Sequence, residues 1–442
     1  MKGRIQRGRE WRSSLASVVR LAFAPLLLAA LLVPGLAQAA KPGALDRSFG
    51  GDGKVTTNFG HYNTALAAAI DRHGRIVAVG SDFDLARYRR NGELDRTFSD
   101  DGKVTGGYDD ALAVAIDSQG RLVVAGSSEE CNFSSTYSSF VLARYRPNGS
   151  PDPSFDPATT YFTGYPCASA NSVAIDSHGR IVVAGGVGGR VEPDCCDFAL
   201  ARYKPNGSLD PSFGGDGQVT TDFHGGGDQA NGVAIDSHGR IVAAGGAGGS
   251  TPTNGGEALA RYRPNGTLDP TFGGDGKVTT ASGRRSIAQS VTIDPQARIV
   301  VAGLANWRGN GQGDFGLARY QSNGTLDPTF GDEGIVTTTF GRDHFDAAAS
   351  VAIDSRGRLV AAGETRRHHP ASDDNFAVSR YRPGGSLDRS FSGNGKVKTT
   401  FGGDDVAEAV ALDSKDRIVA VGGGGRKGDF ALARYIGYRK HR

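Results

Sequence analysis

The residues best suited to hold a metal ion lie in the later part of this 442-residue chain. Histidine nitrogen and carboxylate oxygen are common ligands of zinc and other transition metals. The acidic group and its histidine precede an expected inner strand, whereas a histidine pair follows the second strand of the same sheet. We expect both segments to emerge on one face of the fold. The set consists of Asp343, His344, Asp346 and His368, with His369 adjacent. No zinc-type spacing is present, so chance accumulation in exposed loops is the plainer interpretation.

Other charged residues recur throughout the chain. Three markers each occur seven times: a turn aspartate (Asp71 to Asp413), an Arg-Tyr pair (Arg87 to Arg434) and a second aspartate (Asp46 to Asp388). A reaction needs one asymmetric centre, so residues present in every repeat are expected to cap turns and form ion pairs between strands. The histidines that share one turn position, and that we expect to be exposed, are His73, His178 and His238.

Aspartate-rich turns such as Gly50–Gly53 and Asp100–Gly102 raise the question of calcium, which prefers oxygen ligands. They lack the alternating acidic spacing of a calcium loop, and glycine-rich turns form without an ion. No nucleophile elbow or phosphate loop is present in the sequence. We therefore expect no cofactor and no enzymatic activity, with calcium or a transition metal as the alternative.

The repeat that positions these residues is clearest between residues 233 and 280. Apolar runs at Val233–Ile235 and Arg240–Ala244 flank a tight turn and predict a hairpin. Glu257–Tyr262 and Lys277–Thr280 predict a third and a fourth strand. Because the first two strands are apolar on both faces, each four-stranded sheet needs neighbours on both sides. A spacing of roughly 50 to 60 residues predicts an all-β fold, a seven-bladed β-propeller of four-stranded blades.

The position of each strand relative to the axis follows from side-chain size. Blades converge at the axis, so the strand with an invariably small residue should be innermost. That residue, four places before the turn aspartate, is Ala67, Ala113, Ser172, Gly232, Ser290, Ser350 or Ala409. The fourth strand is rich in threonine and often begins with lysine, which is typical of a protected outer edge.

Ring closure follows from the strands left over at the two ends. The strand Lys54–Thr57 has no blade of its own, and the last blade, which ends at Tyr435, lacks a fourth strand. We therefore predict antiparallel pairing of residues near 54–58 with Phe430–Arg434, closing the ring.

Three motifs recur in order: LD-x-[ST]-F-G-G-D-G-K-V, A-I-D-x-x-G-R-I-V-x-A-G and D-F-x-L-A-R-Y. They resemble the delta-60 repeat of bacterial exported proteins over nearly the whole chain after the leader, and the layout is distantly similar to NHL-type propellers. Residues 150–164 depart from the pattern, with Pro151 in place of leucine. The resemblance implies a β-propeller-like fold and no settled activity.

Residues 1–39 carry six basic residues, an apolar stretch from Leu21 to Leu36, and Ala37-Gln38-Ala39 as a small-residue cleavage site. This pattern predicts a secretory signal peptide, the alternative being an uncleaved membrane anchor. Residues 40–442 would then form one exported propeller, and the resemblance implies a bacterial origin. The leader contributes +5 to a net charge of +3, which leaves −2 for the remainder. That charge gives no electrostatic footprint for nucleic-acid binding.

Four cysteines in an exported chain predict disulfides. Cys131 falls in the loop between the second and third strands of blade 2, and Cys195 and Cys196 in that of blade 3. Cys167 precedes the inner strand of blade 3. We predict two bridges, Cys167 with Cys195 or Cys196, and Cys131 with the other; a vicinal pair and free thiols are the alternatives.

Loops between the second and third strands vary, whereas turns on the opposite face keep one sequence pattern. Variable loops on a rigid scaffold are usual places for binding, although unselected drift would also vary them. The candidate residues are Tyr137, Trp307, Arg308, Arg366, Arg367, His368 and His369. We expect a monomeric binding or scaffold propeller with an extracellular glycan, cell-wall component or protein as partner, and no membrane contact after removal of the signal. A metal-dependent enzyme acting on a sugar or lactone is the alternative.

Overall fold

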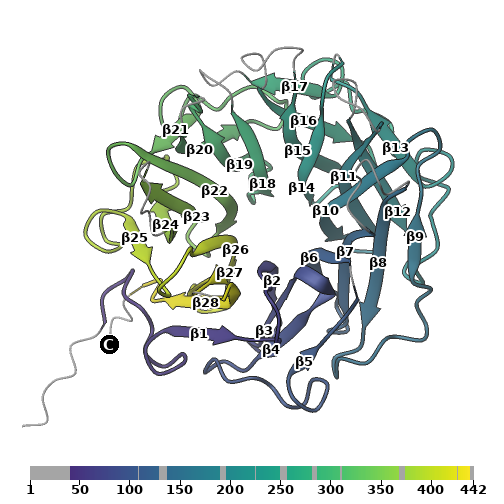
Figure 1. The fold of residues 1–442 in the computed structure, drawn as a ribbon. Coiled ribbons are helices and arrows are strands. Elements are labelled where there is room, and N and C mark those ends of the chain that lie inside the picture. The colour runs from purple at the N-terminus through teal and green to yellow at the C-terminus, as the bar shows by residue number, and fades with distance from the viewer. Residues whose placement is uncertain are drawn as a thin grey trace, which may run out of the picture. The chain divides into compact units, whose positions relative to one another are not determined.

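The structure, a computed structural model, describes residues 40–442 except 108, 129–136, 190–195, 224, 249–255, 281–285, 309–310, 368–373, 426 and 439–442. Seven four-stranded antiparallel sheets surround a central axis (Figure 1). The predicted seven-bladed propeller is therefore confirmed. Among the described residues, no helix has the length and apolar character needed to cross a bilayer.

The strands of each blade are given from the axis outward. Blade 1 contains β2 (Ala65–Ile70), β3 (Ile76–Gly80), β4 (Leu85–Tyr88) and β5 (Lys103–Val104), with a 3-10 turn, η1 (Ser81–Phe83). Blade 2 contains β6 (Asp110–Ile116), β7 (Leu122–Ser128), β8 (Ser139–Tyr145) and β9 (Ala158–Thr160). Blade 3 contains β10 (Cys167–Ile175), β11 (Ile181–Gly188), β12 (Asp197–Tyr203) and β13 (Gln218–Thr221). Blade 4 contains β14 (Gln229–Ile235), β15 (Ile241–Ala247), β16 (Gly256–Tyr262) and β17 (Lys277–Thr280).

Blade 5 contains β18 (Ile287–Ile293), β19 (Ile299–Ala305), β20 (Asp314–Tyr320) and β21 (Ile335–Thr338). Blade 6 contains β22 (His344–Ile353), β23 (Leu359–Arg367), β24 (Asn375–Tyr381) and β25 (Lys396–Thr399). Blade 7 contains β26 (Val406–Leu412), β27 (Ile418–Gly424), β28 (Asp429–Tyr435) and, from the other end of the described chain, β1 (Lys54–Thr57).

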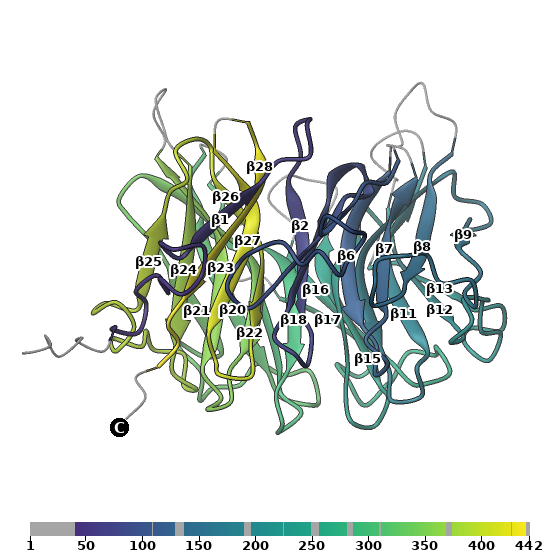
Figure 2. The same cartoon turned by 90° about the horizontal axis from the view of Figure 1, so that it is seen from below.

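The strands run between two faces of the ring, which Figure 2 shows from the side. We call one the loop face: it carries the connections between the second and third strands and the segments that approach each inner strand. We call the other the turn face: it carries the Asp-x-x-Gly-Arg turns and the turns that follow each Arg-Tyr pair. Sequence variation is therefore concentrated on the loop face.

The innermost strands are those predicted, and each contains a β-bulge that the sequence analysis did not anticipate. In every blade the register shifts just before the small residue, for example between Ala230 and Gly232 of β14. Ser172 Oγ accepts a hydrogen bond from the backbone nitrogen of Val233 at 3.1 Å. A Cβ atom added to Gly232 would lie 3.0 Å from the backbone nitrogen of Val291. The residue is small because the next blade's inner strand lies directly against it.

The second strand of each blade separates two hydrophobic cores. In β15, Ile241 and Ala243 pack into the cluster shared with blade 3, whereas Val242 and Ala244 pack into the cluster shared with blade 5. All four are buried. The core of the protein therefore lies between blades, as expected from strands that are apolar on both faces.

Each third-strand arginine bonds to the next blade, and in six blades the tyrosine that follows it bonds to the blade before. In blade 3, Arg202 Nε donates to Asp210 Oδ2 at 2.9 Å and Nη2 to Ser212 Oγ at 2.8 Å, while Nη1 donates to the carbonyl of Pro264 in blade 4. The guanidinium also stacks on Phe213. The adjacent hydroxyl, Tyr203 Oη, lies 2.7 Å from Thr160 Oγ1 in blade 2. These contacts give the recurring arginine and aspartate a structural role.

Burial by itself would raise the pKa of Asp210. Hydrogen bonds from Ser212 and the charge of Arg202 outweigh that effect and hold the pKa of Asp210 below its ordinary value. The aspartate is therefore ionised across the neutral and mildly acidic range, and the pair persists there.

The ring closes as predicted. Strand β1 pairs antiparallel with β28, with Lys54 opposite Ala433 and Thr57 opposite Phe430. The contacts of the Arg-Tyr pair recur across this junction, since Arg434 Nε donates to Asp46 Oδ2 at 2.9 Å and Nη2 to Ser48 Oγ at 2.9 Å. The beginning and end of residues 40–442 thus complete one blade together.

Five blades contain a phenylalanine pair at the loop-face end of the third strand, with ring centroids 4.8 to 5.0 Å apart. Blade 4 departs from this pattern: Glu257 pairs with Thr280 where Phe198 of blade 3 pairs with Thr221. Glu257 is 2 % exposed, and its Oε2 accepts a hydrogen bond from Tyr320 at 3.1 Å. Burial raises the pKa of Glu257 to about 7.

The buried arginine can be tested in blade 4, where Arg261 contacts Asp269, Thr271 and the carbonyl of Ser322. Lysine cannot reach three acceptors at once, so Arg261→Lys should lower the free energy of unfolding by about 3 kcal/mol. Arg263→Lys is the control, because Arg263 is 51 % exposed and its Nε lies 3.9 Å from the same carboxylate. The control should change stability by less than about 0.5 kcal/mol in chemical denaturation. Equal losses in both variants would contradict the role given to Arg261.

Glu257 makes the stability depend on pH. Its folded pKa lies above the ordinary value of 4.5, so the native state keeps a proton that the unfolded chain releases. This contribution is fully present below about pH 4.5 and is lost as the pH rises through about 7. Between pH 5 and 8 the wild type should lose roughly 2 to 3 kcal/mol more unfolding free energy than Glu257→Gln. Parallel pH profiles of the two proteins, measured by denaturation, would show that Glu257 does not titrate as stated.

Candidate ligand-binding face

The first two strands of blade 6 form the longest such pair in the ring, and their extra residues lie at the loop-face end. Strand β22 has 10 residues and β23 has 9, whereas the corresponding strands of blade 4 have 7 each. The predicted residues Arg366 and Arg367 lie at the exposed end of β23. The guanidinium of Arg366 stacks on Phe345 at 4.3 Å, and its Nη1 lies 3.9 Å from Glu364. The hairpin therefore presents two arginines beyond the level of the repeat.

Two of the predicted metal ligands come together at the loop-face end of these strands, where β22 begins. His344 Nδ1 lies 3.9 Å from Asp346 Oδ1 and 2.9 Å from Thr365 Oγ1. Burial and the charge of Lys398 lower the pKa of His344, which favours the neutral ring that binds metals. Asp343 Oδ1 accepts a hydrogen bond from Gln312 of blade 5 at 3.2 Å, and the charge of Asp343 partly opposes the lowering of the His344 pKa. His368 and His369 lie outside the described residues.

Asp346 has a structural role as well. Its Oδ2 accepts a hydrogen bond from the backbone nitrogen of Phe340 at 2.7 Å, and Asp228 and Asp405 cap the equivalent turns in the same way. Their second oxygens accept from Gly248 and Gly425. In blade 6 the longer hairpin pairs Asp346 with Thr365 in the ladder. Among the described residues, Asp346 Oδ1 is buried without a hydrogen-bond partner.

Three further carboxylates converge on the loop face between blades 3 and 4. Asp197, Asp222 and Asp228 each place one oxygen within 4.8 Å of the others. Burial, assisted by the neighbouring carboxylates, raises the pKa of Asp228 to about 6. Oxygen donors in this arrangement suit a divalent cation. Two of these carboxylates also accept hydrogen bonds within the protein. The hydroxyl of Tyr165 donates to Asp197 at 2.7 Å, and the backbone nitrogen of Phe223 donates to Asp228 at 2.6 Å.

The sequence analysis missed this acidic cluster because its members come from separate segments. Asp197 belongs to a repeated motif, Asp222 follows β13, and Asp228 precedes β14. By contrast, the aspartate-rich turns considered for calcium cap backbone nitrogens: Asp52 accepts from Lys54 at 2.9 Å and Asp101 from Lys103 at 2.8 Å. These turns are explained by their own hydrogen bonds.

Blade 5 contributes the segment after β19, with Trp307 half-buried and Arg308 exposed. The backbone nitrogen of Arg308 donates to the carbonyl of Gln312 at 3.1 Å, which folds the segment onto itself. Gly313 forms a parallel bridge with Phe345, so this segment joins the approach to blade 6. The predicted residues of blades 5 and 6 therefore belong to one continuous region.

The large hydrophobic side chains most exposed among the described residues are three tyrosines. Tyr62, Tyr137 and Tyr161 are 74 %, 61 % and 58 % exposed. Tyr62 and Tyr161 lie in the approaches to blades 1 and 3, and Tyr137 lies in the loop of blade 2, so all three are on the loop face. Tyr137 was predicted. Tyr62 and Tyr161 were missed because the approach segments were treated as part of the regular repeat.

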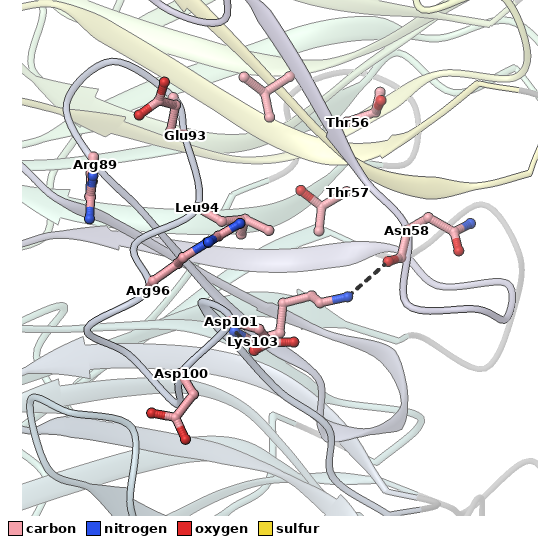
Figure 3. A pocket seen from close by; sticks show the side chains of 12 residues that line it. Thr56, Thr57, Asn58, Arg89, Glu93, Leu94, Arg96, Asp100, Asp101 and Lys103 are labelled. Carbon is pink, nitrogen blue, oxygen red and sulfur yellow. Dashed lines mark hydrogen bonds between the residues drawn. The ribbon is translucent and has the colours of Figure 1, made fainter.

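A pocket of about 830 Å³ lies away from this face, at the outer rim between β1 and blade 1 (Figure 3). Its lining mixes both charges, with Arg89, Arg96 and Asp100, and Lys103 Nζ donates to the carbonyl of Asn58 at 3.3 Å. A similar pocket of about 650 Å³ lies between β21 and blade 6. A groove that recurs with the blades is a consequence of blade packing, and we assign it no specific ligand.

The cysteines are only partly described. Cys167 begins β10, and Cys196 immediately precedes β12, both at the loop-face end of blade 3. The carbonyl of Cys196 accepts a hydrogen bond from the nitrogen of Asp228 at 2.7 Å. Cys131 and Cys195 lie outside the described residues, so the pairing stays a prediction.

Comparison with known proteins supports a β-propeller family. A family model described as a domain of unknown function (DUF5122) beta-propeller matches residues 118–155, 196–213, 238–272, 298–330 and 357–391. These stretches lie in blades 2 to 6. A search of curated proteins found no match.

Several solved structures are similar in fold. The WD40 β-propeller domain of Doa1 has 12 % identity and a TM-score of 0.48, covering 87 % of this chain and 97 % of that one. The extracellular domain of a putative one component system from B. thetaiotaomicron has 14 % identity and a TM-score of 0.44, covering 86 % and 39 %. A gluconolactonase from Xanthomonas campestris has 16 % identity and a TM-score of 0.38, covering 73 % and 92 %.

Proposed function

We propose that this protein is an exported binding or scaffold propeller whose loop face contacts a carbohydrate of the cell envelope or surroundings. The observation that carries the proposal is that the three most exposed large hydrophobic side chains among the described residues, Tyr62, Tyr137 and Tyr161, all lie on that face. Exposed tyrosines on the variable loops of a rigid scaffold favour a binding role for that face.

Tyrosine suits a saccharide because its ring face packs against the apolar face of a sugar while its hydroxyl forms hydrogen bonds. Trp307, Arg308, Arg366 and Arg367 provide a second region of mixed aromatic and cationic character on the same face. A rigid ring that holds adaptable polar and aromatic groups resembles other recognition surfaces built on fixed scaffolds. A protein partner would use the same groups and is the outcome to be distinguished experimentally.

Export is supported by the leader pattern of residues 1–39 and by four cysteines in a chain of 442 residues. The recurring motifs further support placing the chain among delta-60 repeat proteins. We further propose that the protein is a monomer that acts outside the cytoplasm, and the charge of −2 outside the leader supports the absence of nucleic-acid contact.

The second candidate function is a metal-dependent enzyme acting on a sugar or lactone. It is favoured by one observation, the buried Asp346 Oδ1 that has no hydrogen-bond partner among the described residues and lies 3.9 Å from His344 Nδ1. Asp346 and His344 would hold the ion, and the ion would polarise a substrate carbonyl or activate water. A metal site with two described protein ligands is less complete than ordinary catalytic sites, so binding is the better-supported function.

Binding can be tested on a panel of immobilised envelope polysaccharides. Combined replacement of Tyr62, Tyr137 and Tyr161 by alanine should weaken binding at least tenfold, because each lost aromatic contact removes about 1 kcal/mol. His73→Ala with His238→Ala is the matched control on the turn face and should leave affinity within about twofold. If the histidine replacements weaken binding and the tyrosine replacements do not, the binding surface lies on the turn face and the proposal is wrong.

The same assay distinguishes the two candidate functions. A binding propeller should retain saccharide affinity after dialysis against a chelator, and His344→Ala should bind as the wild type does. Stoichiometric metal in the purified protein, lost in His344→Ala together with turnover of a sugar lactone, would instead establish the enzyme. If this protein binds to immobilised proteins but to none of the saccharides, the carbohydrate assignment is wrong.

The disulfide prediction concerns the loop face as well. We propose two bridges, Cys167 with Cys195 or Cys196 and Cys131 with the other, which would fasten the loops of blades 2 and 3. Thiol titration of the denatured, unreduced protein should find no free thiol. Reduction should lower the free energy of unfolding by about 2 to 4 kcal/mol per bridge. Four titratable thiols in the untreated protein would reject both bridges.

A further inference from the structure

The turn face departs from sevenfold repetition where residues 41–44 meet residues 436–438. In the other blades, the third-strand arginine donates Nη1 to a carbonyl in the turn after the next blade's Arg-Tyr pair. Arg380 of blade 6 keeps this contact, since it donates to the carbonyl of Gly437, two residues after Tyr435 of blade 7, but here the turn is built from two segments. The backbone nitrogen of Ser392 donates to the carbonyl of Pro42 at 2.9 Å, and the nitrogen of Gly43 donates to the carbonyl of Ile436 at 2.8 Å. Two separate segments thus replace one turn, and we call this place the seam.

A cavity of about 670 Å³ lies at the seam. Five of its lining residues are cationic, three carry hydroxyl groups, and no carboxylate is among them. The cationic and hydroxyl residues are Lys41, Arg356, Arg358, Arg380, Arg389, Ser390, Ser392 and Tyr438. For comparison, the turn-face cavity between blades 5 and 6 has about 400 Å³ and includes Asp294 in its lining. The seam cavity is therefore more positively charged than this neighbouring cavity, whose lining holds three arginines and one aspartate.

Nearby carboxylates compensate only part of this charge. Arg358 Nε lies 2.5 Å from Asp354 and Arg380 Nε 2.9 Å from Asp388, so each of these acids has an arginine partner. Asp416, the next carboxylate, accepts hydrogen bonds from Ser355. The ion pairs formed among the described residues include none with Lys41, Arg356 or Arg389. Burial and the neighbouring charge of Arg358 lower the pKa of Arg380, in agreement with a local surplus of cations.

Arg358 also holds a hydrogen-bond donor that the protein does not satisfy. Within the described part of the chain, its Nη2 is buried and has no partner. Its side chain is 11 % exposed, whereas the equivalent Arg75 and Arg298 are 28 % and 30 % exposed and can use solvent. A buried donor without a partner is costly, and an oxygen of a bound ligand would remove that cost.

We propose that the seam cavity is a binding site for a phosphate-bearing ligand. Guanidinium groups bind phosphate through paired, charge-assisted hydrogen bonds, and serine hydroxyls add further donors. The volume exceeds that of one phosphate and falls in the range of small-molecule sites. The ligand therefore carries either two linked phosphates or one phosphate on a small organic group. This site is independent of the loop face and of the function proposed there.

The test is isothermal titration of the purified protein with inorganic pyrophosphate, then with inorganic phosphate and with a sugar phosphate. Arg356→Gln with Arg389→Gln should weaken pyrophosphate binding roughly tenfold or more, since two charge-assisted contacts are lost. Both side chains are exposed, so the fold should tolerate the change. His73→Gln with Arg96→Gln replaces the equivalent exposed positions of blade 1 and should leave binding unchanged.

Arg358→Lys provides a second variant, because lysine keeps the charge beside Asp354 but lacks the forked donors. It should weaken pyrophosphate more than it weakens inorganic phosphate, and thermal unfolding of the unliganded variant would report any loss of folding. A higher affinity for the sugar phosphate than for pyrophosphate would identify an organic phosphate as the ligand. Binding that persists in Arg356→Gln with Arg389→Gln, or that falls equally in the blade 1 control, would overturn the proposal. Absence of any binding to the wild type by all three probes would do the same.

Discussion

The buried guanidinium of each third strand is the interaction on which the ring depends. In blade 3 a single side chain, Arg202, contacts an aspartate and a serine of its own blade and a carbonyl of the next, while Tyr203 bonds to the blade before. A charge removed from water needs nearly all its donors satisfied, which restricts the spacing and orientation of adjacent blades. The Arg-Tyr dipeptide thus determines both how adjacent blades are spaced and how the buried charge between them is compensated.

Closure of the ring requires that this contact also form between distant parts of the sequence. Arg434 finds its aspartate at Asp46, near the beginning of the described chain, and β1 supplies the outer strand of blade 7. Without that segment, β28 would be an open edge with unpaired backbone groups. The arginine–aspartate pair, which joins residues close in sequence in the other blades, therefore joins the two ends of the propeller sequence in blade 7.

Much of the fold could be predicted because the repeat carries redundant signals. Small residues such as Gly232 indicated the inner strand, and the leftover strand Lys54–Thr57 indicated the closure. The bulge beside Gly232 could not be predicted, since it arises from the proximity of the next blade. The second role of Lys277 could not be predicted either: it was expected to protect a sheet edge, and it also donates a hydrogen bond to the carbonyl of Asp222 in blade 3. The candidate-site residues were harder to predict from the sequence, because the cluster of Asp197, Asp222 and Asp228 is assembled from separate segments.

Repetition also determines where binding can arise. A charge that recurs in every blade is already committed to a neighbour, as Asp210 is to Arg202, and has little remaining capacity for a ligand. Uncommitted groups are found where the repeat is interrupted: at the longer hairpin of blade 6, in the approaches that carry Tyr62 and Tyr161, and at the seam. At the seam, a ligand held between Lys41 and Tyr438 would contact both segments of the junction at once. Binding there and closure of the ring would then be thermodynamically linked, each stabilising the other.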